Sequence, residues 1–250
     1  MAFAFLVMLP FAITNLKKLP AKKWLIIILV GLIGNLIPAY LFALAETELK
    51  SSLTGILNAL TPIFTLIISV SFFRHKATGL QIFGLLLAFS GSLGLSFIND
   101  SGNLGNMNYY VWLVVIATLL YAVSVNLIKS YFSGTGSVIL TSFAMFSIGP
   151  ISIAYLFSTD FFHRISYSTG AVQSLLYIMI LGVIGTAFAL ILYNKLIKIS
   201  TTVFASSVTY LIPFVAVIWG LIDGENLFFL HYVGMIIVIA GIYIISKEER

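Results

Sequence analysis

The sequence predicts an all-α integral membrane protein, a multi-pass helical bundle of nine spans. Hydrophobic residues fill 60% of the 250 positions and charged residues only 8%, whereas soluble domains average about 45–50% and about 25%. One globule cannot hide so much apolar surface, so the lipid bilayer must solvate much of the chain. In lipid the apolar runs must be helical, because every backbone polar group needs an internal partner.

Nine apolar runs define the predicted spans. Most of them reach the roughly 20 residues that cross a hydrocarbon core about 30 Å thick. The first run is short. We do not interpret it as a signal peptide, because no basic residue precedes it and no cleavage site of small residues follows. The spans are residues 1–16, 24–45, 51–73, 79–98, 109–129, 136–157, 171–193, 201–222 and 228–246.

The positive charges predict how the chain is oriented in the membrane. If the loop at residues 17–23 is cytoplasmic, alternate loops place eleven of the 13 Lys and Arg residues inside and only Lys50 and Arg164 outside. Short loops rich in Lys and Arg stay in the cytoplasm. We therefore expect the protein to lie in the cell membrane with its C-terminus in the cytoplasm. The expected source is a bacterium. Spread over short loops, these charges form no stripe, so the net charge of +5 does not indicate nucleic-acid binding.

The two halves of the chain repeat one another. The motif "GLIGN" at residues 31–35 returns as "GVIGT" at residues 182–186, an offset of 151 residues. An offset of 140 aligns residues 3–13 with 143–153. Because the matches keep the same order through four consecutive spans, they predict two homologous repeats, residues 1–98 and 109–247. Other matched pairs are Pro62 with Pro213, Pro10 with Pro150, Gly84 with Gly234 and Gly91 with Gly241.

The charges predict that the two repeats are inserted in opposite senses. The span that holds Gly31 runs outward, and the span that holds Gly182 runs inward. Inverted repeats related by an axis in the membrane plane are typical of secondary transporters. Because the first repeat has four spans and the second has five, a tenth, N-terminal helix is missing, through a fragment or a misplaced start codon. The alternative is a genuine nine-span protein with its N-terminus outside.

Several stretches resemble EamA-like transporters of the drug/metabolite transporter superfamily. They are "GLIGN", "LNALTPIFTLIISV" and "QIFGLLLAFSGSLGL" in the first repeat, and "GVIGT", "VTYLIPFVAVIWGLIDGEN" and "HYVGMIIVIAGIYI" in the second. The resemblance covers nearly the whole chain. It implies ten helices in two inverted five-helix repeats, a central cavity, and export or exchange of small organic solutes. The chain departs from the pattern where the cavity-lining first helix is missing and where His75 replaces the acid that the second repeat has at Glu225.

Polar side chains and prolines at mid-span predict a solute site. A polar group deep in the bilayer is costly and therefore informative, and a proline bends its helix and frees a carbonyl group. The alternatives are hydrogen bonds between helices and the ordinary tolerance of membrane helices for proline. The residues predicted to line the cavity are Asn35, Asn58, Thr61, Pro62, Tyr121, Asn126, Thr186, Tyr210 and Pro213.

The matched glycines predict close helix packing instead. Gly84 and Gly91 lie seven residues apart, as do Gly234 and Gly241, so each pair falls on one helix face. Small residues at these positions let helix backbones approach closely in lipid.

The absence of catalytic motifs favours transport over catalysis. The sequence has no G-x-S-x-G, H-E-x-x-H or P-loop pattern, no cysteine, and no Asp, Glu, Lys, Arg or His at the centre of a span. We therefore expect no cofactor, no metal and no buried proton relay. The predicted function is alternating-access transport of a small amino-acid-like or drug-like solute. The alternative is a membrane-embedded enzyme or a scaffold protein, which would need no solvent-reachable cavity between the halves.

Overall fold

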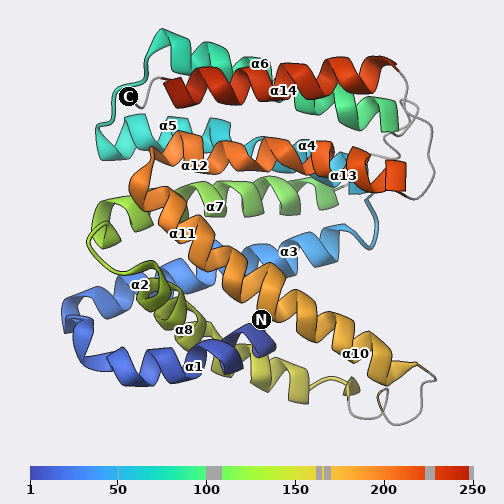
Figure 1. Ribbon diagram of the computed structural model, residues 1–250. Coiled ribbons are helices and arrows are strands. Elements are labelled where there is room, and N and C mark those ends of the chain that lie inside the picture. The colour runs from blue at the N-terminus through green and yellow to red at the C-terminus, as the bar shows by residue number, and fades with distance from the viewer. Residues whose placement is uncertain (50, 100–108, 162–164, 166–169, 223–228, 248–250) are drawn as a thin grey trace. The chain divides into compact units, whose positions relative to one another are not determined.

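The chain is helical in each of the nine predicted spans (Figure 1). The computed structural model describes residues 1–49, 51–99, 109–161, 165, 170–222 and 229–247, and these residues contain no β-strand. The all-α prediction is therefore confirmed. Glu225, which the resemblance singled out, lies outside the described residues.

Six described segments are long and apolar enough to cross a membrane. Two further helices, Gly79–Leu95 and Thr202–Val215, are apolar but shorter over the part whose side chains are described. The first predicted span corresponds to α1 (Ala2–Asn15). A count of nine spans stays a prediction. The six are Ala21–Ala45, Leu53–Phe73, Tyr110–Phe132, Ser137–Phe157, Ala171–Ile199 and Phe229–Lys247.

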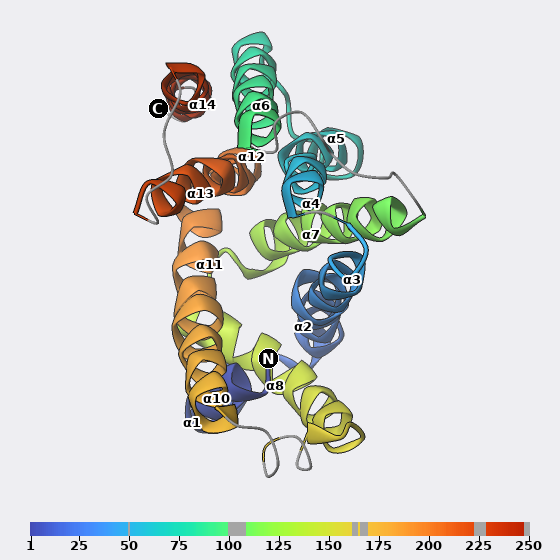
Figure 2. The same ribbon diagram turned by 90° about the vertical axis from the view of Figure 1, so that its right-hand side faces the viewer.

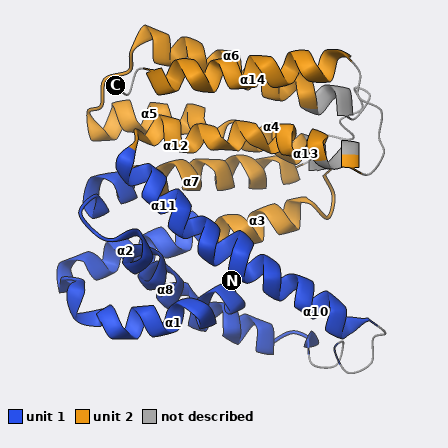
Figure 3. Cartoon of the chain, in the orientation of Figure 1, with its two compact units in different colours: residues 1–36, 127–199 blue, residues 37–126, 200–250 orange. Residues whose placement is uncertain are grey.

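The chain divides into two compact units (Figure 3). Unit 1 comprises residues 1–36 and 127–199, and unit 2 comprises residues 37–126 and 200–250. Each unit takes helices from both predicted repeats. The sequence repeat therefore marks a likeness between segments and does not mark the boundaries of compact bodies.

Unit 1 is built around a small apolar core. Its core side chains are Ala4 and Met8 from α1, Met145 and Ile148 from α8, and Ala187 from the η4 π-helix. The segments α10, η4 and α11 follow one another as a single rod in both views (Figures 1 and 2). The elements of unit 1 besides α1 are α2 (Trp24–Gly31), η3 (Leu32–Leu36), α8 (Ser137–Phe157), α10 (Ala171–Ile180), η4 (Leu181–Phe188), α11 (Ala189–Ile199) and the short 3-10 turns η1 (Leu16–Lys18) and η2 (Ala21–Lys23).

Unit 2 contains the remaining helices. Its main core cluster is Ala59, Ala88, Leu95, Tyr210, Val217 and Val238. The helix α7 belongs to unit 2 up to Asn126 and continues into unit 1. The elements are α3 (Ile37–Ala45), α4 (Ser51–Asn58), α5 (Thr61–Phe73), α6 (Gly79–Asn99), α7 (Tyr110–Phe132), α12 (Thr202–Ser207), η5 (Val208–Tyr210), α13 (Leu211–Ile222) and α14 (Phe229–Lys247).

Within unit 2, α6 and α14 pack side by side in opposite directions (Figure 1). A Cβ atom on Gly84 would lie 2.9 Å from the carbonyl oxygen of Gly241, and one on Gly91 would lie 2.9 Å from the backbone nitrogen of Val238. A Cβ atom on Gly234 would lie 2.8 Å from the Leu95 side chain. The predicted close contact at the matched glycines is therefore confirmed, because a larger residue at Gly84 or Gly91 would have to move the backbone of α14, and one at Gly234 would have to move the Leu95 side chain.

We predict that Gly84→Ala lowers the thermal stability of the detergent-solubilised protein by about 1–3 kcal/mol, because the added methyl group overpacks the contact between α6 and α14. The matched control is Gly94→Ala on the same helix, where a Cβ atom would meet nothing within 4 Å. That control should be neutral or stabilising, since alanine favours helix by about 1 kcal/mol over glycine. Equal melting temperatures for the two variants would contradict the packing role of Gly84.

Candidate functional site

The repeated motif adopts the same rare local structure in both places. Residues 32–36 form the π-helix η3, and their matches at an offset of 151, residues 183–187, lie within the π-helix η4. A π-helical turn inserts an extra residue into an α-helix and is frequent at functional sites. The likeness between "GLIGN" and "GVIGT" is thus a likeness in backbone geometry as well as in sequence.

Two predicted site residues, Asn35 and Thr186, make equivalent bonds in these π-helices. Nδ2 of Asn35 donates to the carbonyl oxygen of Val30 at 3.5 Å. Oγ1 of Thr186 donates to the carbonyl oxygen of Leu181, also at 3.5 Å. Each side chain reaches back five residues, and both bonds are long. The matched side chains therefore bind the backbone of their own interrupted helix in the same way.

A glycine precedes or opens each π-helix and meets a neighbouring helix closely. A Cβ atom on Gly31 would lie 2.9 Å from the carbonyl oxygen of Ala144 on α8, and one on Gly182 would lie 2.9 Å from Cβ of Phe3 and 3.8 Å from the backbone nitrogen of Ala4 on α1. At the offset of 140, Ala4 is the match of Ala144. Each matched glycine thus contacts the corresponding part of the other predicted repeat.

A second pair of interruptions lies in unit 2, before the matched prolines. Residues 59–60 separate α4 from α5, and the 3-10 turn η5 separates α12 from α13. Pro62 and Pro213 follow these breaks and are both buried. A proline has no N–H group, so the carbonyl group of Asn58, four residues before Pro62, loses its usual helical donor. The carbonyl group of Thr209, four residues before Pro213, accepts instead from the N–H of Leu211. Each predicted repeat therefore has a helix break before a buried proline near mid-span.

The other matched prolines behave differently. Pro10 and Pro150 lie inside α1 and α8, which remain continuous, and both are exposed. Proline alone thus does not explain the breaks in unit 2, and the exposed pair provides a natural control for them.

A buried polar ladder begins at the break between α4 and α5. Oγ1 of Thr61 donates to Oδ1 of Asn58 at 3.3 Å, and Oγ1 of Thr65 donates to the carbonyl oxygen of Thr61 at 2.8 Å. From α7, Nδ2 of Asn126 donates to the carbonyl oxygen of Thr65 at 3.2 Å. Further along the same face, Oγ1 of Thr202 lies 3.5 Å from Oγ of Ser69. These contacts join three of the predicted site residues.

Thr65 and Ser69 were missed by the sequence prediction. Both are buried, with at most 2% of the side chain exposed. Their signal was present in the sequence, since Asn58, Thr61, Thr65 and Ser69 are spaced by three or four residues and so share one helix face. A search restricted to the middle of each span does not find such a stripe.

Three buried polar atoms of unit 2 have no hydrogen-bond partner among the described residues. They are Oδ1 of Asn126, the hydroxyl of Tyr210 and Oγ1 of Thr54. Asn126 and Tyr210 are 0% exposed. Exchanging the nitrogen and oxygen of the Asn126 amide would not give Oδ1 a partner, because Oδ1 would then face the carbonyl oxygens of Thr65 and Ala122, which accept from Nδ2. A buried polar atom left without a partner costs about 1–3 kcal/mol, which makes these three atoms candidates for binding a polar group.

Aromatic rings accompany the polar atoms. The ring of Tyr121 stacks on Phe42 with centroids 6.0 Å apart, and the ring of Tyr210 meets Phe89 at 6.4 Å. Unit 2 thus combines helix breaks, unpartnered side-chain atoms and aromatic rings.

The predicted site residues divide between the two units. Unit 1 holds Asn35 and Thr186, and no described contact links them to each other. That all nine line one cavity stays a prediction. Unit 2 holds the other seven, Asn58, Thr61, Pro62, Tyr121, Asn126, Tyr210 and Pro213.

Interrupted apolar helices that carry buried polar groups are typical of multi-pass membrane transporters. The chain belongs to the EamA-like transporter family, which matches residues 1–97 and 108–247. The resemblance seen in the sequence is therefore confirmed. Family membership indicates a transporter rather than an enzyme.

Two relatives and one solved structure are similar to the chain. An uncharacterized transporter of Archaeoglobus fulgidus is 26% identical over 234 residues, which cover 93% of this chain and 81% of the relative. Protein PagO of Salmonella typhimurium is 30% identical over 184 residues, which cover 72% of this chain and only 59% of PagO. A protein crystal structure aligns with a TM-score of 0.74 at 13% identity, over 100% of this chain and 85% of that one. At that identity the likeness shows the fold alone.

We predict that Tyr210→Phe leaves the stability of the solute-free protein unchanged or raises it by about 1 kcal/mol, because the lost hydroxyl has no partner to lose. In unit 1, Asn194→Ala should lower stability by about 1–3 kcal/mol, since Nδ2 of Asn194 donates to Oγ1 of Thr141 at 2.9 Å. Thermal unfolding in detergent measures both. A loss in Tyr210→Phe as large as in Asn194→Ala would show that the hydroxyl is already satisfied.

Proposed function

We propose that the protein moves a small organic solute across the cytoplasmic membrane by alternating access, as an exporter or exchanger, with its C-terminus in the cytoplasm. The observation that carries the proposal is the pairing of interruptions. Each predicted repeat has one π-helix at the repeated glycine motif and one break before a buried proline. In secondary transporters, discontinuous helices of this kind form the substrate site near the middle of the bilayer.

Opposite insertion of the two repeats is supported by α6 and α14. These matched helices run in opposite directions, and the contact pairs Gly84 with Gly241 while Gly234 approaches Gly91. A two-fold axis that turns Gly84 onto its match Gly234 and Gly91 onto its match Gly241 would also turn the first of these contacts onto the second. This is the interface that inverted repeats would produce. Two equivalent halves can exchange roles, which is how such a protein opens to either side.

The composition of unit 2 favours a solute with hydrogen-bond donors and an apolar part. Oδ1 of Asn126, which has no partner among the described residues, and the carbonyl group of Asn58, which loses its usual helical donor at Pro62, are acceptors that suit N–H or O–H groups. The rings of Phe89 and Tyr121 suit an apolar or aromatic portion. Irregular backbone is tolerated in a membrane where it is buried in protein or lines a cavity. An amino-acid-like or drug-like amine or amide satisfies both halves of this description.

The alternative is a membrane enzyme or a scaffold. A scaffold would leave the broken backbone and the unpartnered atoms without a function, at a cost of about 1–3 kcal/mol for each buried polar atom. The transport proposal gives these atoms a partner.

The direct test is a solute panel with the protein in proteoliposomes. Amino acids, polyamines, nucleosides and lipophilic cations should be tried in counterflow, and we expect saturable exchange of at least one amine- or amide-bearing class. Vesicles with the Tyr210→Phe variant should show weaker apparent affinity for the same solute. Exchange of none of these solutes, in protein shown to be folded by its melting transition, would remove the proposal.

The helix breaks should be needed for transport and not for folding. Pro62→Ala and Pro213→Ala each supply the missing N–H group, and we expect transport to fall about tenfold or more, equivalent to about 1.4 kcal/mol. Pro150→Ala removes a proline from an exposed, unbroken site and should transport like the wild type. Similar rates in all three variants would show that the breaks have no part in transport.

A further inference from the structure

Seven lysines gather at one end of unit 1. We call this the lysine end, and it comprises Lys17, Lys18, Lys22, Lys23, Lys129, Lys195 and Lys198. The lysines come from three separate stretches: the turns η1 and η2, the end of α7, and the end of α11. Hydrogen bonds show that these stretches meet.

Three half-buried lysines tie the stretches together. Nζ of Lys23 donates to the carbonyl oxygen of Tyr131 at 2.6 Å, and Nζ of Lys129 donates to the carbonyl oxygen of Lys198 at 3.0 Å. Nζ of Lys198 donates to the carbonyl oxygen of Thr135, in the connection before α8. Two of these acceptors lie in the last turns of α7 and α11, where free carbonyl groups and the helix dipole attract cations.

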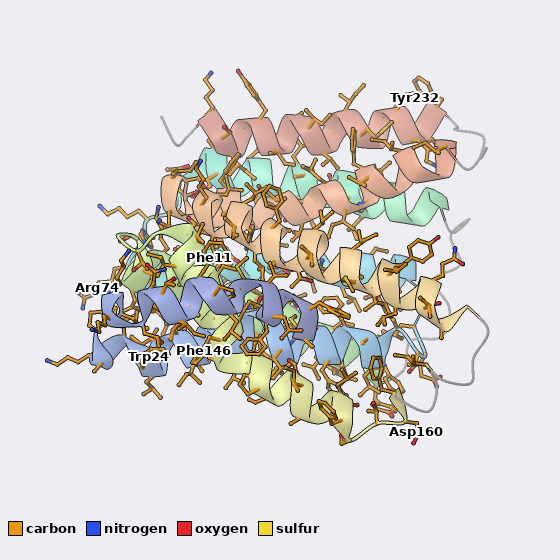
Figure 4. All side chains as sticks on the ribbon, turned by 60° about the horizontal axis from the view of Figure 1, so that its bottom comes forward. Phe11, Trp24, Arg74, Phe146, Asp160 and Tyr232 are labelled. Carbon is orange, nitrogen blue, oxygen red and sulfur yellow. The ribbon has the colours of Figure 1, made fainter. Side chains whose placement is uncertain are left out.

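The other four lysines are exposed and make no bond within the described part of the chain. They are Lys17, Lys18, Lys22 and Lys195. No acid lies near them in sequence, since the only Asp or Glu in residues 1–36 and 127–199 is Asp160. That residue follows the far end of α8, whose 21 residues span about 32 Å. Figure 4 shows Asp160 and Trp24 at opposite ends of this unit. The charge of the lysine end is therefore not neutralised within unit 1.

Aromatic side chains border the lysines. Trp24 follows Lys23 directly and packs on Phe143 with ring centroids 5.5 Å apart. Tyr131 is 46% exposed, and Nζ of Lys23 lies 5.4 Å from the centroid of the Phe132 ring. Trp and Tyr are enriched at the level of lipid headgroups. The lysine end thus has the two features of a headgroup layer, an unneutralised positive charge and interfacial aromatic rings.

We propose that the four exposed lysines bind the headgroups of anionic phospholipids of the inner leaflet. The proposal rests on the proposed orientation, which places residues 17–23 in the cytoplasm. Each Lys near an anionic surface contributes about 1 kcal/mol of attraction. The three bonded lysines hold the exposed ones in one place, so little freedom is lost when a headgroup binds. Headgroup phosphate is the chemistry recognised, and lipid rather than free phosphate is its source because Trp24 and Tyr131 anchor the same end at the membrane surface.

The test is a titration of the whole detergent-solubilised protein with short-chain phosphatidylglycerol. We compare Lys17→Gln/Lys22→Gln/Lys195→Gln with a control that removes three positive charges from unit 2, Arg74→Gln/Lys76→Gln/Lys247→Gln. At about 1 kcal/mol for each lysine, the first variant should bind about 100-fold more weakly. The control should stay within about threefold of the wild type, because none of its three charges belongs to the lysine end. Equal binding by the two variants would overturn the proposal.

Two further measurements keep the result decisive. In the wild type, short-chain phosphatidylcholine should not compete with phosphatidylglycerol, and inorganic phosphate at the same concentration should compete only weakly. If phosphate competes as well as the lipid does, the lysine end is a simple anion site and the lipid proposal is rejected. If the glutamine variant does not fold, Lys17→Arg/Lys22→Arg/Lys195→Arg should retain binding, and loss in that variant would count against the proposal. No transported solute enters these titrations, so failure of transport and failure of lipid binding are separately visible.

Discussion

The structure depends on one constraint, the need of every backbone N–H and C=O group in lipid for an internal partner. A continuous helix meets it automatically, and most of this chain consists of such helices. Four interruptions, η3, η4, the break at residues 59–60 and η5, are the places where the continuous α-helix is lost. At two of them a π-helix keeps the bonding pattern with an inserted residue, and at the other two a proline removes a donor. All four fall at matched positions of the predicted repeats, which is why we relate them to function.

The interruptions also explain the placement of the polar side chains. Asn35 and Thr186 bond to the backbone of their π-helices, so part of their role is structural. In unit 2, Thr61 and Thr65 bind neighbouring oxygens along α5, while Asn126 and Tyr210 keep one polar atom each without a partner among the described residues. The first group stabilises the broken helices, and we propose that the second group, Asn126 and Tyr210, binds the solute. Neutral groups of this kind favour recognition through dipoles and hydrogen bonds over ion pairing.

Much of the fold could be predicted from the sequence, because long apolar runs have few alternatives in lipid. All nine predicted runs are helical, with ends that agree to within about three residues except that the seventh run, predicted to end at 193, continues to Ile199. The π-helices could not be predicted, since a change of hydrogen-bond register leaves no distinct composition. Thr65 and Ser69 were missed because their meaning lies in helical spacing rather than in depth. The two compact units were not foreseen either, because repeats in sequence record likeness, whereas contacts such as that between α6 and α14 join segments far apart in the chain.

The central claim is that the two repeats cross the membrane in opposite senses. The chain has no cysteine, so single cysteines can be introduced without other changes. Glu48 and Ile199 are both exposed, and they lie 151 residues apart, which is the repeat offset. We replace each of them by cysteine in turn. With a membrane-impermeant thiol reagent on intact cells, Glu48→Cys should be labelled from outside and Ile199→Cys only after the membrane is opened. Labelling of both positions from the same side would contradict the account.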